Sequence, residues 1–595
     1  MSQTASADRP VPHPAPPLAL LAFRVVCAAA VIATVAVAAA LWGARHAGWA
    51  GVGIGLPLGV AAALAVRTLP MALCAPSAPA RPLAPVRAGL LLPAAGAVFL
   101  LVLAPLLATP LPPFDDYLNH LARIHLIALG NAPSPLHAFY AIHWKPIPNL
   151  AMDLVVPPLA RLIGTFAAGK LFLIVATLLL LTGPFAIFAA LYRQLSPGPL
   201  AAALFVANYI SKMGVVNYEF GVGLALFGIA GWIALGERRA RWRGLASAVW
   251  VPVLFFSHFV ALGIYAMAIA SFEIWRLWSR PAERRRWPAD AAALLLPFLI
   301  MPLLLAAGWG GQHPLVANSW GGLHSRIEGL QMLVEAYYSR LDLLFLLGMV
   351  GGLIWALRRR MLSLPGCGWV FLALAGTVYL LTPERTLGSW GAAARLPTGI
   401  AFVLCGLLRW DLPSAAAQRA FLAALALLAV FRTATVEAAF LRYDRVRRDV
   451  AASLPLLPPG SRVLVAEDYA HDDNALRAIR QLPCLAMIER ASLVSLAYSD
   501  PLSQILVVRP PYRASTGGFN DDPVALPALL HPPAQDPPPL TLDFDPTGRI
   551  YWRDWPHAYD YVYVLNREER TSPDPARLQL LFTGHRVQLF RVRPD

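Results

Sequence analysis

The chain has little charge for its length. Of its 595 residues only 14% are Asp, Glu, Lys or Arg, while 57% are hydrophobic and the mean hydropathy is +0.56. A soluble enzyme of this size needs a more polar surface, and the apolar residues here occur in runs long enough to cross a bilayer. The composition therefore argues against a soluble protein and predicts a polytopic, mainly α-helical membrane protein.

Acidic residues are scarcest in the first three-quarters of the chain. Residues 1–439 carry 31 Lys and Arg against 15 Asp and Glu, whereas residues 440–595 carry 18 against 19. The formal net charge of +15 thus comes from the apolar part, where basic loops mark the cytoplasmic side of a membrane. We therefore expect no nucleic-acid partner.

Cysteine and the common cofactor motifs are also scarce. Of five cysteines, Cys27, Cys74, Cys367 and Cys405 lie in or beside apolar runs, and Cys484 stands alone in the C-terminal part, which excludes a disulfide there. No CxxC, HExxH or zinc-like spacing occurs. The chain also lacks a Walker A motif and a GxGxxG that opens a helix after a strand, which argues against an ATP-driven pump and a Rossmann-type nucleotide-sugar enzyme.

What the chain does have is apolar segments, about 11 to 13 of them if a crossing needs roughly 20 residues and short segments are admitted. They cover residues 19–43, 51–66, 88–109, 170–192, 198–211, 217–236, 244–256, 259–275, 290–308, 341–357, 366–382, 397–409 and 420–437. The segments at 198–236 and 244–275 could each be a hairpin or one bent helix. Basic residues at both ends of 244–275 favour a hairpin there, because a single crossing would leave one arginine cluster outside.

The basic clusters set the orientation. All of them fall on one side when the N-terminus is cytoplasmic; they lie at 67–87, 193, 238–243, 276–286, 358–360 and 409–419. The opposite side then receives 110–169, 309–340, 383–396, everything after about 438, and the turns near Asn217 and His258. This threading predicts a multi-pass protein of the bacterial inner (plasma) membrane with a periplasmic or extracellular C-terminal domain.

Five parts follow from this reading. They are a disordered N-terminal tail (1–18), N-terminal transmembrane helices (19–109), a first large extracytoplasmic loop (110–169), a transmembrane bundle (170–437) and an extracytoplasmic α/β domain (438–595). In the last part, apolar runs at 461–468, 504–510, 559–566 and 585–593 predict strands, and 473–482 predicts a helix.

The first large loop opens with adjacent carboxylates, Asp115 and Asp116, in the stretch PPFDDYLNHLARIHLIALG. Acidic groups at the mouth of a membrane span are costly to desolvate, so they usually react, bind an ion or cap a helix. A helix over 115–129 at the membrane surface would place Asp116, His120 and Arg123 on one face. Asp after two prolines also suits a helix N-cap, but capping does not explain the other two residues.

The chain resembles the GT-C superfamily of integral-membrane glycosyltransferases. The resemblance is carried by the stretch FDDYLNHLAR, by the later WKPIPNLAMDLVVPPLARL at 144–162, and by the order of crossings, outer loop and exported domain. The resemblance covers the organisation of nearly the whole chain through short motifs. It departs from the usual pattern in having an additional N-terminal hairpin. It implies that Asp116, or else Asp115, is the catalytic base, and that the donor is a sugar on a polyprenyl phosphate at the outer surface.

This chemistry needs a base and cations. One carboxylate would take a proton from the acceptor hydroxyl, helped if its neighbour's charge raises its pKa, and the leaving phosphate needs positive groups. The candidate substrate-binding residues on the outer side are His120, Arg123, Lys145, Lys212, Asn217, His258, Arg326 and Arg395, with Arg385 as a further cation. His324 and Arg326 could close over the site. Asn149 and Asp153 are expected to orient the loop.

Simpler roles remain open for several candidates. Lys212 could snorkel or pair with Glu219, His258 could be a core histidine, and Arg395 could anchor the interface. No cofactor is established, although the two carboxylates with His120 could hold a divalent cation. The expected partners are the lipid bilayer, a polyprenyl-phosphate-linked sugar and a glycan, lipid or protein acceptor.

Two other functions stay open: a non-catalytic assembly or polysaccharide-binding protein with a GT-C-like body, and a lipid-linked-sugar transporter. A transporter would use matching interrupted helices in two halves, and the sequence shows none.

Overall fold

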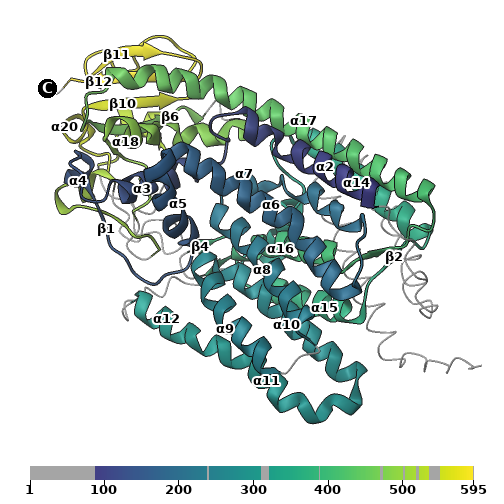
Figure 1. Ribbon diagram of the computed structural model, residues 1–595. Helices are drawn as coiled ribbons and strands as arrows, with labels where there is room; N and C mark the ends of the chain where they lie inside the picture. The colour runs from purple at the N-terminus through teal and green to yellow at the C-terminus, as the bar shows by residue number, and fades with distance from the viewer. Residues whose placement is uncertain are drawn as a thin grey trace, which may run out of the picture.

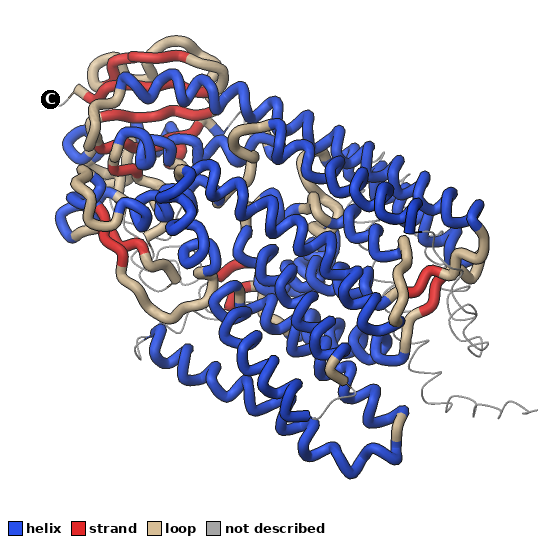
Figure 2. Tube along the Cα trace, in the orientation of Figure 1, coloured by secondary structure: helices blue, strands red, loops and turns tan. Residues whose placement is uncertain are grey.

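The computed structural model describes residues 88–236, 240–309, 320–386, 389–469, 473–499, 503–517, 522–534 and 550–593. The predicted N-terminal tail and the predicted spans at 19–43 and 51–66 lie outside the described residues. Within them the protein is mainly helical, with a smaller region of strands near the C-terminus (Figures 1 and 2).

Seven helical stretches of the described part are long and apolar enough to cross a membrane, judged by length and composition. They are α2 (Ala88–Ala108), α6 (Thr165–Tyr192), α8 (Val216–Ala234), α10 (Phe259–Ser279), the continuous stretch Trp287–Gly308, α14 (Ser339–Arg358) and α17 (Ala415–Ser453). Three further helices complete the bundle: α9 (Ala240–Ser257), α15 (Gly366–Leu381) and α16 (Ala392–Leu407). Eleven of the predicted segments fall within the described residues: seven of them are these long apolar helices, three are the shorter α9, α15 and α16, and the segment 198–211 is irregular.

Two predicted spans depart from a regular α-helix. Residues 198–211 form a 3₁₀ helix, η1 (Gly198–Phe205), and a separate single turn, α7 (Tyr209–Lys212), which Asn208 caps through its side chain. The stretch 287–308 is divided into α11 (Trp287–Leu295), the 3₁₀ turn η3 (Leu296–Leu299) and α12 (Ile300–Trp309), because Pro297 cannot donate a helical hydrogen bond. The predicted hairpin at 244–275 is confirmed: α9 and α10 are separated by His258 in an extended conformation, and Arg243 near the start of α9 pairs with Glu273 near the end of α10.

The helices pack closely where glycine allows it. On α8, a Cβ at Gly223 would lie 2.5 Å from the Cβ of Leu179 on α6, so only glycine fits without a shift. The buried core between α8, α10, α15 and α16 is almost wholly apolar and includes Leu226, Tyr265 and Phe402. This close helix packing fixes the positions of the helix ends, where the polar residues lie.

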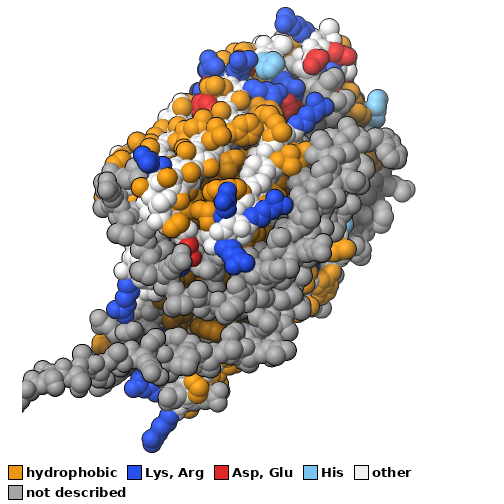
Figure 3. Space-filling view, turned by 90° about the vertical axis from the view of Figure 1, so that its right-hand side faces the viewer, with side chains coloured by type: hydrophobic (Ala, Val, Ile, Leu, Met, Phe, Trp, Pro, Cys, Tyr) orange, Lys and Arg blue, Asp and Glu red, His pale blue; other side chains and the backbone are white. Residues whose placement is uncertain are grey.

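The loops gather at two opposite ends of the bundle. At one, which we call the basic end, Tyr192 OH donates to Leu407 O (2.8 Å), and β2 (Leu362–Ser363) pairs with β5 (Arg409–Trp410). At the other, the motif end, the amide of Asp115 donates to Lys212 O (2.9 Å). The loops that the charge pattern assigned to opposite sides therefore lie at opposite ends. Figure 3 views the side of the molecule on which β2 lies, and among its described atoms basic side chains stand around a broad apolar area.

The C-terminal region contains a six-stranded mixed sheet in the order β11-β12-β10-β6-β7, with β9 also paired to β6. Its strands are β6 (Arg462–Glu467), β7 (Leu493–Val494), β9 (Val524–Ala525), β10 (Tyr561–Leu565), β11 (Leu578–Thr583) and β12 (Val587–Val592). β6 and β10 are parallel, whereas β12 runs antiparallel to β10 and β11. Three of the four predicted strands are confirmed in this sheet.

Two elements of this region differ from expectation. The predicted strand at 504–510 is β8 (Leu506–Val508), which pairs with β1 (Tyr140–Ile142) of the first loop and not with the main sheet. The predicted helix at 473–482 is a kinked 3₁₀ helix, η6 (Asn474–Cys484), which continues into α18 (Leu485–Arg490).

Helix α17 joins the bundle to the sheet without a break (Figure 1). Its last third shares a buried core with one face of the sheet and with α3 (Tyr117–Leu129), the helix that follows the acidic motif. Ser453 at its end hydrogen-bonds Tyr563 OH (2.6 Å). The boundary expected at 438 falls inside this helix. The sheet region is therefore held against the first loop.

Candidate functional site

The acidic motif lies against the loop that follows α7. The amides of Asp115 and Asp116 donate to the carbonyls of Lys212 (2.9 Å) and Met213 (3.0 Å). The next residue, Gly214, has φ +77°, and a Cβ there would lie 2.9 Å from the Asp116 nitrogen. A left-handed conformation and so close a backbone approach both favour glycine. Backbone hydrogen bonds thus join the acidic motif to the loop after α7, about 100 residues later, at the motif end.

Asp116 precedes helix α3 (Tyr117–Leu129) but does not cap it with its side chain. Its Oδ1 accepts a hydrogen bond from the hydroxyl of Tyr498 (2.6 Å), in the C-terminal region. The carboxylate is half-buried. Asp116 thus occupies the N-cap position that the sequence suggested but makes no side-chain capping bond, and the predicted helix is present over 117–129 with this carboxylate turned to the C-terminal region.

Asp115 faces two cations. Its Oδ2 lies 3.5 Å from Nε of Arg477 on η6. Lys212 is only 1% exposed, and its Nζ stands 5.2 Å from the centroid of the Tyr209 ring. Burial lowers the pKa of Lys212, while the charge of Asp115 opposes that shift because it stabilises the ammonium. Glu219, the alternative partner for Lys212, accepts a hydrogen bond from Ser211.

Asp116 also shares its surroundings with Arg395 and His258. The negative charge of Asp116 acts on Arg395, which is 8% exposed at the start of α16 and whose carbonyl accepts a hydrogen bond from Tyr218 OH (2.6 Å). His258 meets the Tyr218 ring edge-on at 5.2 Å, and its Nδ1 accepts from the Val260 amide (3.1 Å). Burial lowers the pKa of His258, and Arg395 lowers it further. This histidine is therefore a neutral group beside a cation.

His120 and Arg123 do not form the open polar face that helical spacing suggested. Arg123 is 1% exposed and makes a two-point ion pair with Asp153 of α5 (Ala151–Ile163), at 2.5 and 2.9 Å. Its Nη2 also lies 2.9 Å from His120 Nδ1, and its Nη1 donates to Gln504 (2.7 Å). Burial lowers the pKa of His120 first, and Arg123 second. The reason for the difference is that the C-terminal region covers this face of α3.

The remaining candidates have structural contacts of their own. Asn217 is fully buried, accepts from the Met152 amide (2.7 Å) and donates to Asn149 O (2.9 Å), which fastens α8 to the start of α5. Arg326, on α13 (Gly322–Gln331), is 5% exposed; it donates to Thr382 O and lies over the Tyr379 ring at 5.6 Å.

Three more candidates lie in loops. Lys145 is half-buried between β1 and α5. Arg385 lies in β3 (Arg385–Thr386), which pairs with β4 (Ser389–Trp390) beside the start of α16. His324 is largely exposed on α13, with Nε2 3.3 Å from Glu328.

Sequence reasoning missed the contribution of the C-terminal region. Arg477 and Tyr498 reach the two carboxylates, and Asn119 of α3 donates to Gln481 (2.6 Å) and accepts from the Tyr498 amide (3.0 Å). Asp522 lies 3.6 Å from Arg477. Tyr498 is 382 positions from Asp116, and no local pattern could have paired them.

Among the described residues, no group of three or more His, Cys, Asp or Glu side chains is arranged to hold a metal ion. His120, proposed above as a possible ligand with the carboxylates, directs Nδ1 to Arg123. The possible divalent cation therefore has no ligand cluster among the described residues.

No family model matches the chain, and no curated protein or solved structure matches it. Its function has to be inferred from the site and from the arrangement of the helices.

Proposed function

We propose that this protein is a multi-pass membrane glycosyltransferase of the GT-C kind, which moves a sugar from a polyprenyl-phosphate carrier to an extracytoplasmic glycan, lipid or protein acceptor. The observation that carries the proposal is the motif end: two half-buried carboxylates framed by the cations Lys212, Arg395 and Arg477. An adjacent base and cations are what transfer from a phosphate requires.

The placement in the membrane follows from the two ends of the bundle. Long apolar helices run between them, and the arginine clusters at the ends of α6, α10 and α14 and in β5 lie at the basic end, which the positive-inside rule assigns to the cytoplasm. The motif end and the C-terminal region then lie outside the cytoplasm, where nucleotide sugars are absent and a lipid-linked donor is needed. For a bacterial protein this is the inner membrane, with the sheet in the periplasm.

The proposed reaction assigns each group one task. The acceptor hydroxyl oxygen bonds to the anomeric carbon of the donor sugar, its proton passes to Asp116, and the bond from that carbon to the phosphate oxygen breaks. The phosphate leaves with the electron pair, and Arg395 and Lys212 stabilise its increased negative charge. Asp116 is the better base because Asp115 already faces Arg477.

The C-terminal region would complete the site. Tyr498 donates to Asp116 and so orients the carboxylate, while Arg477 and Asp522 lie on the exposed side of Asp115, where an acceptor could approach. A base must lie within hydrogen-bond reach of the hydroxyl it deprotonates. We therefore assign acceptor binding to the surface that η6 and the acidic motif form together.

Asp116→Asn tests the proposal. The amide keeps the size of the side chain but cannot accept the proton, so surface glycan measured by mass spectrometry should fall at least a hundredfold, within the usual ~10²–10⁴ range for general acid–base catalysis. Asp554→Asn is the matched control, because Asp554 is exposed and its side chain contacts only His557 among the described ion pairs. Unchanged glycan in Asp116→Asn at normal protein level would favour a non-catalytic assembly or transport role.

A further inference from the structure

A cavity of about 200 Å³ lies at the basic end, far from the acidic motif, between the last turns of α10 and helix α11. One wall is apolar and is made by Ile274, Leu277, Leu294 and Leu295. The other wall is charged and includes Glu273, Arg276 and Asp290, with Arg280 and Trp287 also lining the cavity. The cavity is thus amphipathic, with one apolar wall and one charged wall.

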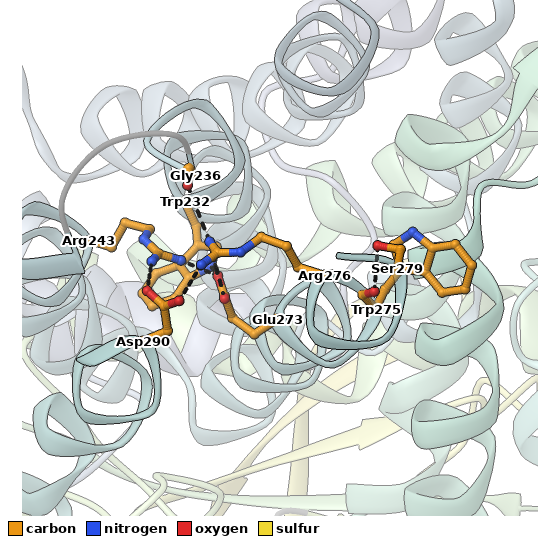
Figure 4. Close-up of polar contacts among 8 residues, drawn as sticks. All are labelled: Trp232, Gly236, Arg243, Glu273, Trp275, Arg276, Ser279 and Asp290. Carbon is orange, nitrogen blue, oxygen red and sulfur yellow. Dashed lines mark hydrogen bonds and ion pairs between the residues drawn. The ribbon is translucent and has the colours of Figure 1, made fainter. Parts of the chain in front are cut away.

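The ionic wall is already balanced (Figure 4). Arg243 pairs with both Glu273 and Asp290, and Arg276 pairs with Asp290 and lies 3.3 Å from Glu273. Arg276 also donates to Gly236 O (3.2 Å) and Trp232 Nε1 donates to Glu273 (2.9 Å). Two guanidinium groups therefore match two carboxylates, so the carboxylates do not leave the wall negative.

The segment at the mouth is basic in sequence, with four arginines and one glutamate over residues 280–286. Arg280 lines the cavity and is exposed, and Arg285 and Arg286 of the adjoining 3₁₀ turn η2 (Pro281–Arg286) are exposed as well. Trp278 and Trp287 are 55% and 54% exposed beside them. Exposed tryptophans next to arginines are typical of the level at which a bilayer meets water.

We propose that this cavity binds an anionic phospholipid, with the phosphate near Arg280 and the start of one acyl chain along Leu277 and Leu294. Charge complementarity selects the anion, because basic pockets between membrane helices on the cytoplasmic side attract acidic headgroups. The apolar wall selects a lipid over soluble phosphate. The inference rests on the proposed membrane placement and is independent of sugar transfer.

Native mass spectrometry of the full-length protein in mild detergent tests this, with phosphatidylglycerol and phosphatidylcholine offered at equal concentration. We expect one phosphatidylglycerol to be retained in preference to phosphatidylcholine. Ala291→Phe, which fills the cavity without changing charge, should abolish that retention. Arg280→Gln should weaken it about fivefold, since one arginine near an acidic lipid surface contributes about 1 kcal/mol.

Arg358→Gln with Arg359→Gln is the matched control, because these exposed arginines lie at the same end on α14 and outside the cavity. The control should retain the lipid at the wild-type level. Equal weakening in the control and in Arg280→Gln would overturn the proposal, because it would show nonspecific attraction. So would retention by Ala291→Phe, or displacement of the lipid by millimolar inorganic phosphate.

Discussion

Asp116 stands where a helix-capping side chain would be expected, yet it is bonded to a tyrosine from the other end of the chain. Sequence identified this residue and its neighbour because two acids beside an apolar run are unusual. It could not identify Tyr498, since nothing in SLAYSD distinguishes that tyrosine from a buried core residue. The sequence therefore predicts the acidic motif of this site but not the distant tyrosine that contacts it.

Removing the Tyr498 hydroxyl should slow the proposed reaction without unfolding the protein. A hydrogen bond to a charged group contributes about 1.5–3 kcal/mol, so Tyr498→Phe should lower kcat by about tenfold to a hundredfold and change KM little. The measurement is sugar transfer by protein reconstituted in vesicles. Tyr512→Phe is the control, because that ring packs on Phe139 instead. A change confined to KM would mean that Tyr498 binds substrate and does not position the carboxylate.

The buried histidine His120 should make the protein less stable in acid. Its pKa is lowered in the folded state by burial and then by Arg123, whereas in the unfolded chain it is near 6.5. The unfolded state therefore binds the proton more readily, so the stabilisation is present above pH 6.5 and is lost as the pH falls below it. Thermal unfolding in detergent between pH 7.5 and 5 should show this fall.

His120→Gln should reduce that pH dependence, since glutamine can still accept from Arg123 and does not titrate. His324→Gln changes a largely exposed histidine and serves as the control. If the slope with pH is the same in all three proteins, His120 does not set acid stability.

At the scale of elements, α3 shows what helical periodicity can and cannot predict. Its bounds follow from the pattern, but the pattern assumed one free face, whereas α5 and α6 pack on one side and α18 and η6 on the other. The polar residues of α3 consequently became links between elements: Arg123 to α5, and Asn119 to the C-terminal region. Periodicity reports which residues share a face, and only the fold decides what covers it.

The Arg123–Asp153 pair should be a strong link between α3 and α5. Asp153→Ala leaves a buried guanidinium without its carboxylate, which typically costs about 3–5 kcal/mol. Replacing both, as Arg123→Met with Asp153→Leu, should restore much of that loss because no buried charge remains. Chemical unfolding of Arg123→Met, Asp153→Leu and the double variant measures the coupling. A double variant as unstable as the sum of the two single ones would show that the pair is not coupled.

At the scale of the whole molecule, hydropathy predicted most helices, and alternating strand patterns predicted most of the sheet. The failures have two causes, local helix breakers and long-range contacts. Residues 198–211 are apolar enough for a span, but prolines and glycine near Gly198 and the cap at Asn208 break them, and η1 packs against α6, α16 and α17. The strand β8, in contrast, pairs with β1, some 366 residues earlier, which no local pattern contains.

The proposed topology predicts which residues an impermeant reagent can reach. In a background with Cys27 and Cys74 replaced by serine, Asp554→Cys should be labelled by a charged maleimide in intact cells, whereas Arg359→Cys should need permeabilised cells. Both positions are exposed, and the described cysteines Cys367, Cys405 and Cys484 are buried. The opposite pattern would place the acidic motif in the cytoplasm and would remove the lipid-linked donor from the proposal.

Helix α17 has a consequence for the spacing of the whole assembly. At 1.5 Å per residue its 39 residues extend about 58 Å, roughly twice the ~30 Å hydrocarbon layer. If the bundle spans a bilayer as proposed, the helix is a rigid spacer that sets the distance of the sheet from the lipid surface. One residue inserted into the helix would rotate the sheet by about 100° about the helix axis. Seven inserted residues would return the sheet to nearly its original orientation, about two helical turns farther from the membrane. The length of this one helix thus sets how far from the membrane surface an acceptor can be bound.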